Sequence, residues 1–236
     1  MRHKLLLSIL CALALGAGIF YWMRTSHPST ILPIISTLQP IYLQNVNYLY
    51  QKEIYSMYKT KQADIVMFGD SHTYGINWGE ALGRTNIANR GIRGDILDGF
   101  IKRIDQVYAL QPRICFVMGG INDFYAYVSV DKVFTQYCQL IEMLRSHNIT
   151  VIIQATIYVG ASLEDAIERN AQVTELNNKL RAYATANSLR FIDINPLIST
   201  HSALKPELTI EGLHLNANGY KFWLPEVEKV LIEEGL

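Results

Sequence analysis

Ser71 has the sequence setting of a nucleophile. The apolar run at residues 65–68 leads directly into Gly69-Asp70-Ser71, and an unbroken apolar run of this length is typical of a buried central strand. Ligands bind at the carboxyl ends of such strands in open α/β sheets. Because a glycine lets the backbone turn sharply there, the hydroxyl of Ser71 would face the ligand. Taken alone, the stretch is equally compatible with a polar turn between a strand and a helix.

Other residues could complete the chemistry that a serine nucleophile requires. His214 could be the base that takes the proton of the hydroxyl. The carboxylate of Glu211, three residues earlier, could hold the imidazole in the correct tautomer. A tetrahedral oxyanion needs preorganised donors, which we assign to the N–H of Ser71, the N–H of Gly91 and the side-chain amide of Asn122. Together these groups could perform acyl transfer at an ester carbonyl.

These residues can meet only if strands and helices alternate along the chain. The hydrophobic pattern predicts strands at residues 65–68, 86–88, 113–118, 150–156 and 190–194. It predicts helices at residues 41–60, 96–110, 130–147, 163–187 and 217–234. Such alternation indicates βαβ units and a parallel sheet covered on both faces, here a three-layer, flavodoxin-like α/β fold with five strands. The carboxyl ends of its strands would bring the polar residues to one edge.

Four short blocks resemble those of the SGNH, or GDSL-type, hydrolase family and occur in that family's order. The blocks are Gly69-Asp70-Ser71, Gly91 in Asn-Arg-Gly-Ile-Arg-Gly-Asp, Gly120-Ile121-Asn122-Asp123, and His214 in Gly-Leu-His-Leu-Asn. The resemblance covers residues 64–223 and implies a flavodoxin-like fold. It also implies ester hydrolysis through an acyl-serine on Ser71, with His214 as the base, the same three oxyanion donors, and no metal or cofactor.

The chain departs from the family's pattern at Glu211. The family usually has aspartate three residues before the histidine, and the glutamate side chain is one methylene longer. We expect Glu211 to orient His214 if the loop backs away slightly. The alternative is that Glu211 points into solvent and a backbone carbonyl orients the imidazole.

Three residues are candidates for substrate binding. His72 follows the nucleophile and could line the site, although a histidine at a helix start or in solvent fits equally well. Phe124 and Tyr125 follow Asn122 on a predicted loop. We expect the two aromatic side chains to wall the substrate site, and packing beneath the loop is the alternative.

The N-terminal segment predicts export. Basic residues precede an almost wholly apolar stretch at residues 5–23, which is long enough to span a bilayer as a helix. The stretch ends in an aromatic pair, so we favour a signal anchor over residues 1–24, with the catalytic domain outside the cytoplasm. A cleaved signal peptide, which would leave a secreted or periplasmic protein, and a buried core helix are the alternatives. A linker and lead-in helix would occupy residues 25–62, and the hydrolase domain residues 63–236.

Composition narrows the partners. The 236 residues are 50% hydrophobic, which is enough for one sizeable core. The 21 basic and 21 acidic side chains give a net charge of zero, so no electrostatic argument favours nucleic acid. The three cysteines lack C-x-x-C spacing, which argues against a disulfide framework or a zinc site. Free thiols are favoured, and a Cys115–Cys138 bridge in an oxidising compartment is the alternative.

The sequence therefore predicts an exported serine esterase. An exported location suits removal of short acyl groups, such as acetyl, from a glycan, cell-wall or lipid substrate, with the membrane contacted through the N-terminal span. One alternative is an acyltransferase that uses the same acyl-enzyme on an exported polysaccharide. Another is a catalytically silent glycan- or lipid-binding module. The presence of Ser71, Asn122 and His214 together argues against the silent module, since a binding protein does not need all three.

Overall fold

The computed structural model describes residues 39–236. The chain divides into two compact units, Met1–Gln44 and Asn45–Leu236, and the described part of the first contains helix α3 (Ile41–Gln44). The predicted signal anchor and most of the predicted linker lie outside the described residues. Between residues 39 and 236, no helix is both long and apolar enough to cross a membrane.

The second unit is built on a five-stranded parallel sheet with the strand order β2-β1-β3-β4-β5. The strands are β1 (Ile65–Gly69), β2 (Ile87–Gly91), β3 (Ile114–Met118), β4 (Thr150–Gln154) and β5 (Arg190–Ile192). Gly69 at the end of β1 pairs with Gly91 of β2 and with Met118 of β3, so these three strands end level. The chain passes from β1 to β2 and then returns to the other side of β1, which makes the β1–β3 junction the topological switch point where ligands bind in such sheets.

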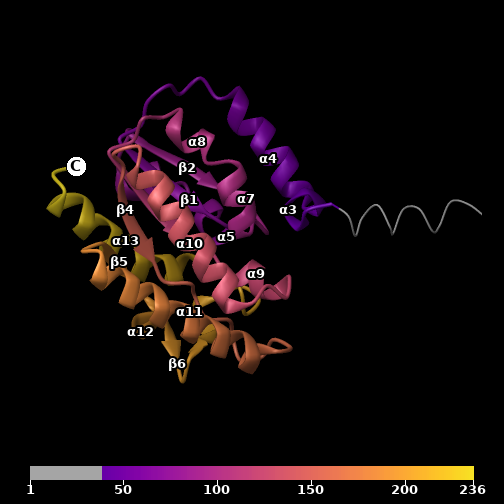
Figure 1. Ribbon diagram of the computed structural model, residues 1–236. Coiled ribbons are helices and arrows are strands. Elements are labelled where there is room, and N and C mark those ends of the chain that lie inside the picture. Colours follow the sequence, from indigo (N-terminus) through magenta and orange to yellow (C-terminus); the bar gives the residue numbers. More distant parts are fainter. Residues whose placement is uncertain (1–38) are drawn as a thin grey trace, which may run out of the picture. The chain divides into compact units, whose positions relative to one another are not determined.

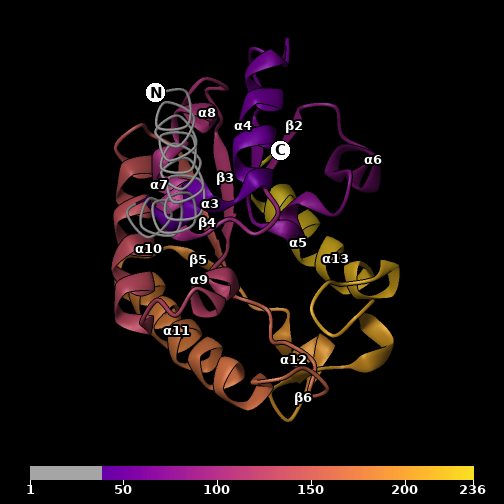
Figure 2. The ribbon, with the colours of Figure 1, turned by 90° about the vertical axis from the view of Figure 1, so that its right-hand side faces the viewer.

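Helices cover both faces of this sheet (Figures 1 and 2). One face carries α7 (Leu97–Lys102), α10 (Val130–Arg145) and α11 (Ala166–Ala186), and the other carries α6 (Trp78–Leu82) and α13 (Ala217–Glu233). The remaining elements of this unit are α4 (Val46–Met57), α5 (Ser71–Tyr74), α8 (Asp105–Tyr108), α9 (Ile121–Tyr125), α12 (Asn195–Ile198), the β6–β7 hairpin (Ser199–Thr200 and Ala203–Leu204) and a 3-10 helix (Pro206–Leu208). The predicted α/β fold with a five-stranded parallel sheet is confirmed.

The central strand shows why its sequence is an unbroken apolar run. Successive side chains of a strand point to opposite faces of the sheet. Val66 and Phe68 enter the core beneath α7, α10 and α11, whereas Ile65 and Met67 enter the core beneath α6 and α13. All four side chains are completely buried. A strand covered on both faces needs an apolar residue at every position, whereas one with a solvated face alternates.

Two predicted helices are interrupted. The helix expected at residues 96–110 is the pair α7 and α8, which separate at Arg103, where the backbone leaves helical geometry (φ −123°) and the side chain bonds inward to Asp95. The helix expected at residues 41–60 breaks at Asn45, whose side chain instead caps α4 by accepting the N–H of Asn47 at 3.0 Å. In both cases a polar side chain prefers a non-helical contact to helix continuation.

Other boundaries also differ from expectation. Helix α4 belongs to the second unit and buries Tyr48 and Tyr55, so this unit begins well before the predicted boundary at residue 63. Strand β2 runs on to Gly91 instead of ending at residue 88. The helix predicted at residues 217–234 is α13, which contains Pro225 in its interior and packs its apolar face against the core. Cys115 and Cys138 are free thiols.

Candidate active site

Ser71, His214 and Glu211 form a continuous chain of polar contacts. Ser71 is the first residue of α5, directly after β1, and its Oγ lies 3.0 Å from Nε2 of His214. Nδ1 of the same imidazole contacts the carboxylate of Glu211. With Nδ1–H donating to Glu211, Nε2 is left to accept the Ser71 hydroxyl proton. The arrangement has the order hydroxyl, imidazole, carboxylate that activates a serine.

The loop before α13 shows how a glutamate fits at position 211. Oε1 of Glu211 also lies 3.4 Å from the backbone N–H of His214, so the carboxylate folds back over its own turn. Gly212 in that turn has φ +94°, which favours glycine. The hydroxyl of Thr209 accepts the Gly212 N–H at 2.9 Å and donates to the His214 carbonyl at 2.7 Å. The alternative, in which Glu211 points into solvent and a carbonyl orients His214, is not the arrangement seen.

Two of the predicted oxyanion donors are available to a ligand. Within residues 39–236, the N–H of Ser71 donates to no other group. The amide of Asn122 donates one N–H to the carbonyl of Asp95 at 3.0 Å, which leaves its second N–H. Asp123 holds the same region by accepting the N–H of Leu97 at 3.1 Å. Burial raises the pKa of Asp123 well above its usual range, although that N–H opposes the shift.

Gly91, the third predicted oxyanion donor, is engaged elsewhere. Its N–H donates to Oδ1 of Asn89 at 2.8 Å. A Cβ at position 91 would lie 2.3 Å from the backbone nitrogen of Tyr74, so a side chain there would displace α5. Gly91 is therefore a glycine because helix α5 packs tightly against β2, and its assignment to the oxyanion hole is not supported.

Gly94 is a second glycine of the same segment, and within residues 39–236 its backbone N–H is free. It has φ +69° and lies in the turn between Ile92 and Asp95, whose last carbonyl receives the Asn122 amide. Among the described residues its N–H has no acceptor. The sequence does show this second glycine in the same loop. Because β2 extends to Gly91, Gly91 belongs to the strand and only Gly94 lies beyond it.

The structure moves two of the three predicted substrate-binding residues away from any ligand. Phe124 is fully buried in the core that lies beneath α10 and α11. His72 is only 1% exposed and faces the loop that carries His214. Tyr125 is half-exposed at the end of α9, where its ring lies 5.4 Å from the guanidinium of Arg169. In each case the helix that carries the residue directs its side chain according to packing that the local sequence does not reveal.

A buried cation supports the backbone beneath the site. Arg103 is 0% exposed, and its Nε donates to Oδ2 of Asp95 at 2.6 Å. The remaining guanidinium nitrogens donate to the carbonyl of Arg90 at 2.7 Å and to that of Gly69 at 3.0 Å. One side chain thus links the carboxyl ends of β1 and β2 to the turn before α7. This side chain was not singled out from the sequence.

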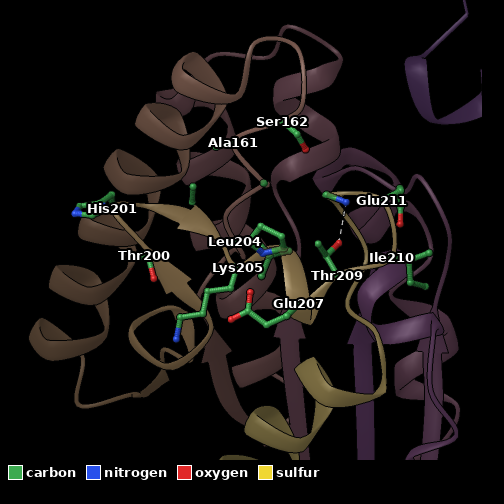
Figure 3. Close-up of a pocket in the computed structure, with 14 residues that line it drawn as sticks. Ala161, Ser162, Thr200, His201, Leu204, Lys205, Glu207, Thr209, Ile210 and Glu211 are labelled. Atoms are coloured by element: carbon green, nitrogen blue, oxygen red, sulfur yellow. Dashed lines mark hydrogen bonds between the residues drawn. The ribbon is translucent and has the colours of Figure 1, made fainter.

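A pocket of about 620 Å³ is lined in part by Glu211 (Figure 3). Its border combines the loop of Ala161 and Ser162, the β6–β7 hairpin and the segment that leads to Glu211. Hydroxyl and charged side chains predominate among its polar lining residues, which are Ser162, Thr200, His201, Lys205, Glu207, Thr209 and Glu211. Because Glu211 both lines the pocket and contacts His214, the pocket adjoins the contacts between Ser71, His214 and Glu211.

The fold and the site together define an α/β protein with a serine, a histidine and a glutamate in contact at the carboxyl edge of a parallel sheet. Residues 67–222 match the GDSL-like lipase/acylhydrolase family, and the chain belongs to that family. Family membership makes the protein a hydrolase, in agreement with the similarity of its fold to that of solved GDSL-type proteins.

Solved structures show the same fold. A GDSL-like lipase from Bacteroides thetaiotaomicron superposes with a TM-score of 0.68 at 23% identity, covering 80% of this chain and 98% of that one. An acetyl xylan esterase superposes with a TM-score of 0.63 at 22% identity, covering 71% of this chain and 98% of that one. The chain is also 26% identical to an N-acylneuraminate cytidylyltransferase of Streptococcus agalactiae serotype III over 168 residues, and this aligned region covers 71% of the chain. It spans only 38% of that relative's length.

Proposed function

We propose that this protein is a serine esterase that removes short acyl groups through an acyl-Ser71 intermediate. The observation that carries the proposal is the chain of contacts from the Ser71 hydroxyl through His214 to Glu211. His214 takes the hydroxyl proton as Ser71 Oγ attacks the ester carbonyl, and the resulting imidazolium gives that proton to the leaving alcohol. Water then attacks the acyl-serine, again with His214 as the base, and releases the acid.

Donors around Ser71 would stabilise the tetrahedral intermediates of both steps. We assign this duty to the Ser71 N–H, the free N–H of Asn122 and, in place of Gly91, the N–H of Gly94. Losing one such donor typically costs about 2.7–4 kcal/mol of transition-state stabilisation. Asp95 contributes indirectly, because its carbonyl fixes the direction of the Asn122 amide.

An acetylated carbohydrate is the substrate that the surroundings favour. The pocket beside Glu211 combines hydroxyl and charged side chains with a larger apolar lining, and its polar groups suit the hydroxyls of a sugar. Two proteins of similar fold are named for acetylated xylan or xylooligosaccharides, and the curated relative is named for N-acylneuraminate. These names support a carbohydrate ester and do not identify which one.

Acyl-chain profiling tests the acyl specificity. With p-nitrophenyl esters of increasing chain length, kcat/KM for acetate is expected to exceed that for octanoate by about 10-fold or more, because the proposed substrate carries acetyl groups, as do the substrates named for two proteins of similar fold. A clear preference for octanoate would exclude the short-acyl proposal. Adding an oligosaccharide acceptor separates hydrolysis from transfer, because a transferase would form an acylated oligosaccharide where an esterase releases free acetate.

The Glu211→Gln variant tests the orienting role of the carboxylate. We expect kcat to fall by on the order of 10- to 1000-fold, because an amide neither favours the imidazolium nor enforces its tautomer. A fluorophosphonate probe should still label Ser71, although more slowly. Glu228→Gln is the matched control, since Glu228 is a glutamate of α13 that pairs with Arg84 and does not line the pocket. Unchanged activity in Glu211→Gln would assign the orienting role to another group.

A further inference from the structure

His72 joins the turn that carries the nucleophile to the loop that carries the base. It is the second residue of α5, adjacent to Ser71, and is 1% exposed. Its Nε2 lies 2.9 Å from the carbonyl of Leu213, the residue before His214. Residues 72 and 213 are 141 positions apart, so this bond closes a long-range contact beside the catalytic pair.

The surroundings of the ring define its protonation. A carbonyl only accepts, so Nε2 must carry a proton to bond Leu213. Nδ1 lies 3.4 Å from Oδ1 of Asp70, and it has no other partner in the described residues. If Nδ1 were bare, its lone pair would face a buried carboxylate without any donor between them, which is a costly arrangement. Protonation of both nitrogens satisfies Leu213 and provides Asp70 with a counter-charge.

We propose that His72 is a positioning residue, which as an imidazolium holds the His214 loop against the Ser71 turn. The proposal rests on the esterase function proposed above. The rings of His72 and His214 have centroids 5.7 Å apart, so a shift of the Leu213 backbone would be passed directly to the base. Misplacement of reacting groups by about 1 Å can cost 100-fold in rate. His72 touches neither substrate nor the Ser71 hydroxyl, so it acts only through His214.

The charged groups around His72 support the imidazolium. Burial lowers the pKa of His72, but the Asp70 carboxylate, the Leu213 carbonyl and the more distant Glu211 raise it, and the net direction is upward. From α13, the Tyr220 hydroxyl donates to the His72 carbonyl at 2.6 Å and so fixes the backbone without facing the ring. The second ring nearby is His214. Negative charge therefore dominates around the His72 ring.

Two variants of His72 separate the effect of its hydrogen bond to Leu213 from the effect of its side-chain volume. In the full chain, His72→Phe keeps a ring but no donor, whereas His72→Gln can keep an amide donor near the position of Nε2. For p-nitrophenyl acetate we expect His72→Phe to lower kcat by about 10- to 100-fold with KM within about threefold, and His72→Gln to recover most of that loss. His147→Gln is the matched control, because His147 stacks on Tyr108 just after α10, before β4 begins, away from the carboxyl edge. Equal activities for the two His72 variants would overturn the proposal.

A measurement that needs no turnover tests the charge. With isotope-labelled histidine in the inactive Ser71→Ala chain, nuclear magnetic resonance should show both ring nitrogens of His72 protonated at neutral pH, with a hydrogen bond to Leu213. A neutral ring would contradict the proposal even if ester hydrolysis is confirmed. Conversely, absence of hydrolysis by the wild type would reject the esterase function, while this spectrum would still report the state of His72.

The same charge predicts a pH dependence of stability. Because the folded-state pKa of His72 is raised above 6.5, its contribution to the free energy of unfolding is complete below that pH. The contribution is lost as the pH rises through the folded-state pKa. Chemical denaturation of wild type and His72→Gln at a series of pH values should therefore show their stabilities converging on the alkaline side. Parallel curves across this range would mean that folding leaves the pKa of His72 unchanged, and a wild-type advantage that grows with pH would mean that the ring is held neutral.

Discussion

Replacing Ser71 with alanine is expected to lower kcat for ester hydrolysis by on the order of 10⁴- to 10⁶-fold, because no other group can form the acyl-enzyme. Among residues 39–236, the one hydrogen bond of Ser71 Oγ is with Nε2 of His214. The backbone at position 71 would keep its place, because Asp70 still caps α5 by accepting the N–H of His72 at 3.0 Å. We therefore expect the melting temperature to stay within about 2 °C of the wild-type value.

The measurement combines kinetics, probe labelling and thermal unfolding. A fluorophosphonate should label the wild type and fail to label Ser71→Ala. Ser129→Ala is the control with the opposite expected outcome, because Ser129 has a structural role: it caps α10 by accepting the N–H of Lys132 at 3.4 Å. That variant should lose about 0.5–2 kcal/mol of stability and keep its activity. Retained hydrolysis in Ser71→Ala would remove the serine from the mechanism.

Replacing Arg103 with methionine is expected to produce the largest loss of stability, about 3–5 kcal/mol, because it leaves a buried carboxylate and two carbonyls without their donor. The guanidinium is completely buried and its donors are divided among Asp95, Arg90 and Gly69. Removing the cation leaves Asp95 to ionise alone in the interior or to take up a proton. Either response costs folding free energy near neutral pH.

Denaturant unfolding of Arg103→Met beside Arg84→Met provides the comparison. Arg84 also bonds a carboxylate, that of Glu228 at 2.8 Å, but both side chains are partly exposed. Its loss should cost about 1 kcal/mol or less. Arg103→Met combined with Asp95→Leu should recover part of the loss, because the double replacement leaves no unpaired charge. Similar costs for the two single variants would show that burial adds nothing to the Arg103 contacts.

The Ser71 and Arg103 variants test two parts of the same strand end, the proposed nucleophile and the backbone that supports it. Ser71 stands at the end of β1, and Arg103 fixes the last carbonyl of that same strand through Gly69. Ser71 therefore follows a strand whose last carbonyl is bonded by the buried Arg103 side chain, whereas His214 and Glu211 come from a part-exposed loop. The distance between the Ser71 hydroxyl and the His214 imidazole depends on both the strand end and the loop, and we expect it to control the rate of ester hydrolysis.

Much of the fold followed from local pattern. The unbroken apolar run at β1 required a strand covered on both faces, and alternation of strands and helices required a parallel sheet. The pairing of Ser71 with His214 could also be anticipated, because a parallel sheet delivers the ends of its strands to one edge whatever the intervening sequence. The orienting carboxylate was expected three residues before the histidine, and Glu211 does contact that imidazole.

Only the tertiary structure decided which neighbouring residue performs each task. Gly91 and Gly94 lie in one short segment, but the side chain of Asn89 engages the N–H of the first, whereas the N–H of the second has no acceptor among residues 39–236. His72 follows the nucleophile in sequence, yet it points toward Leu213 rather than toward a ligand. Arg103 carries no local signal at all, because its partners come from two strand ends and a turn. Sequence periodicity fixes the face that an element buries, whereas the direction of a single polar side chain depends on partners that only folding brings near.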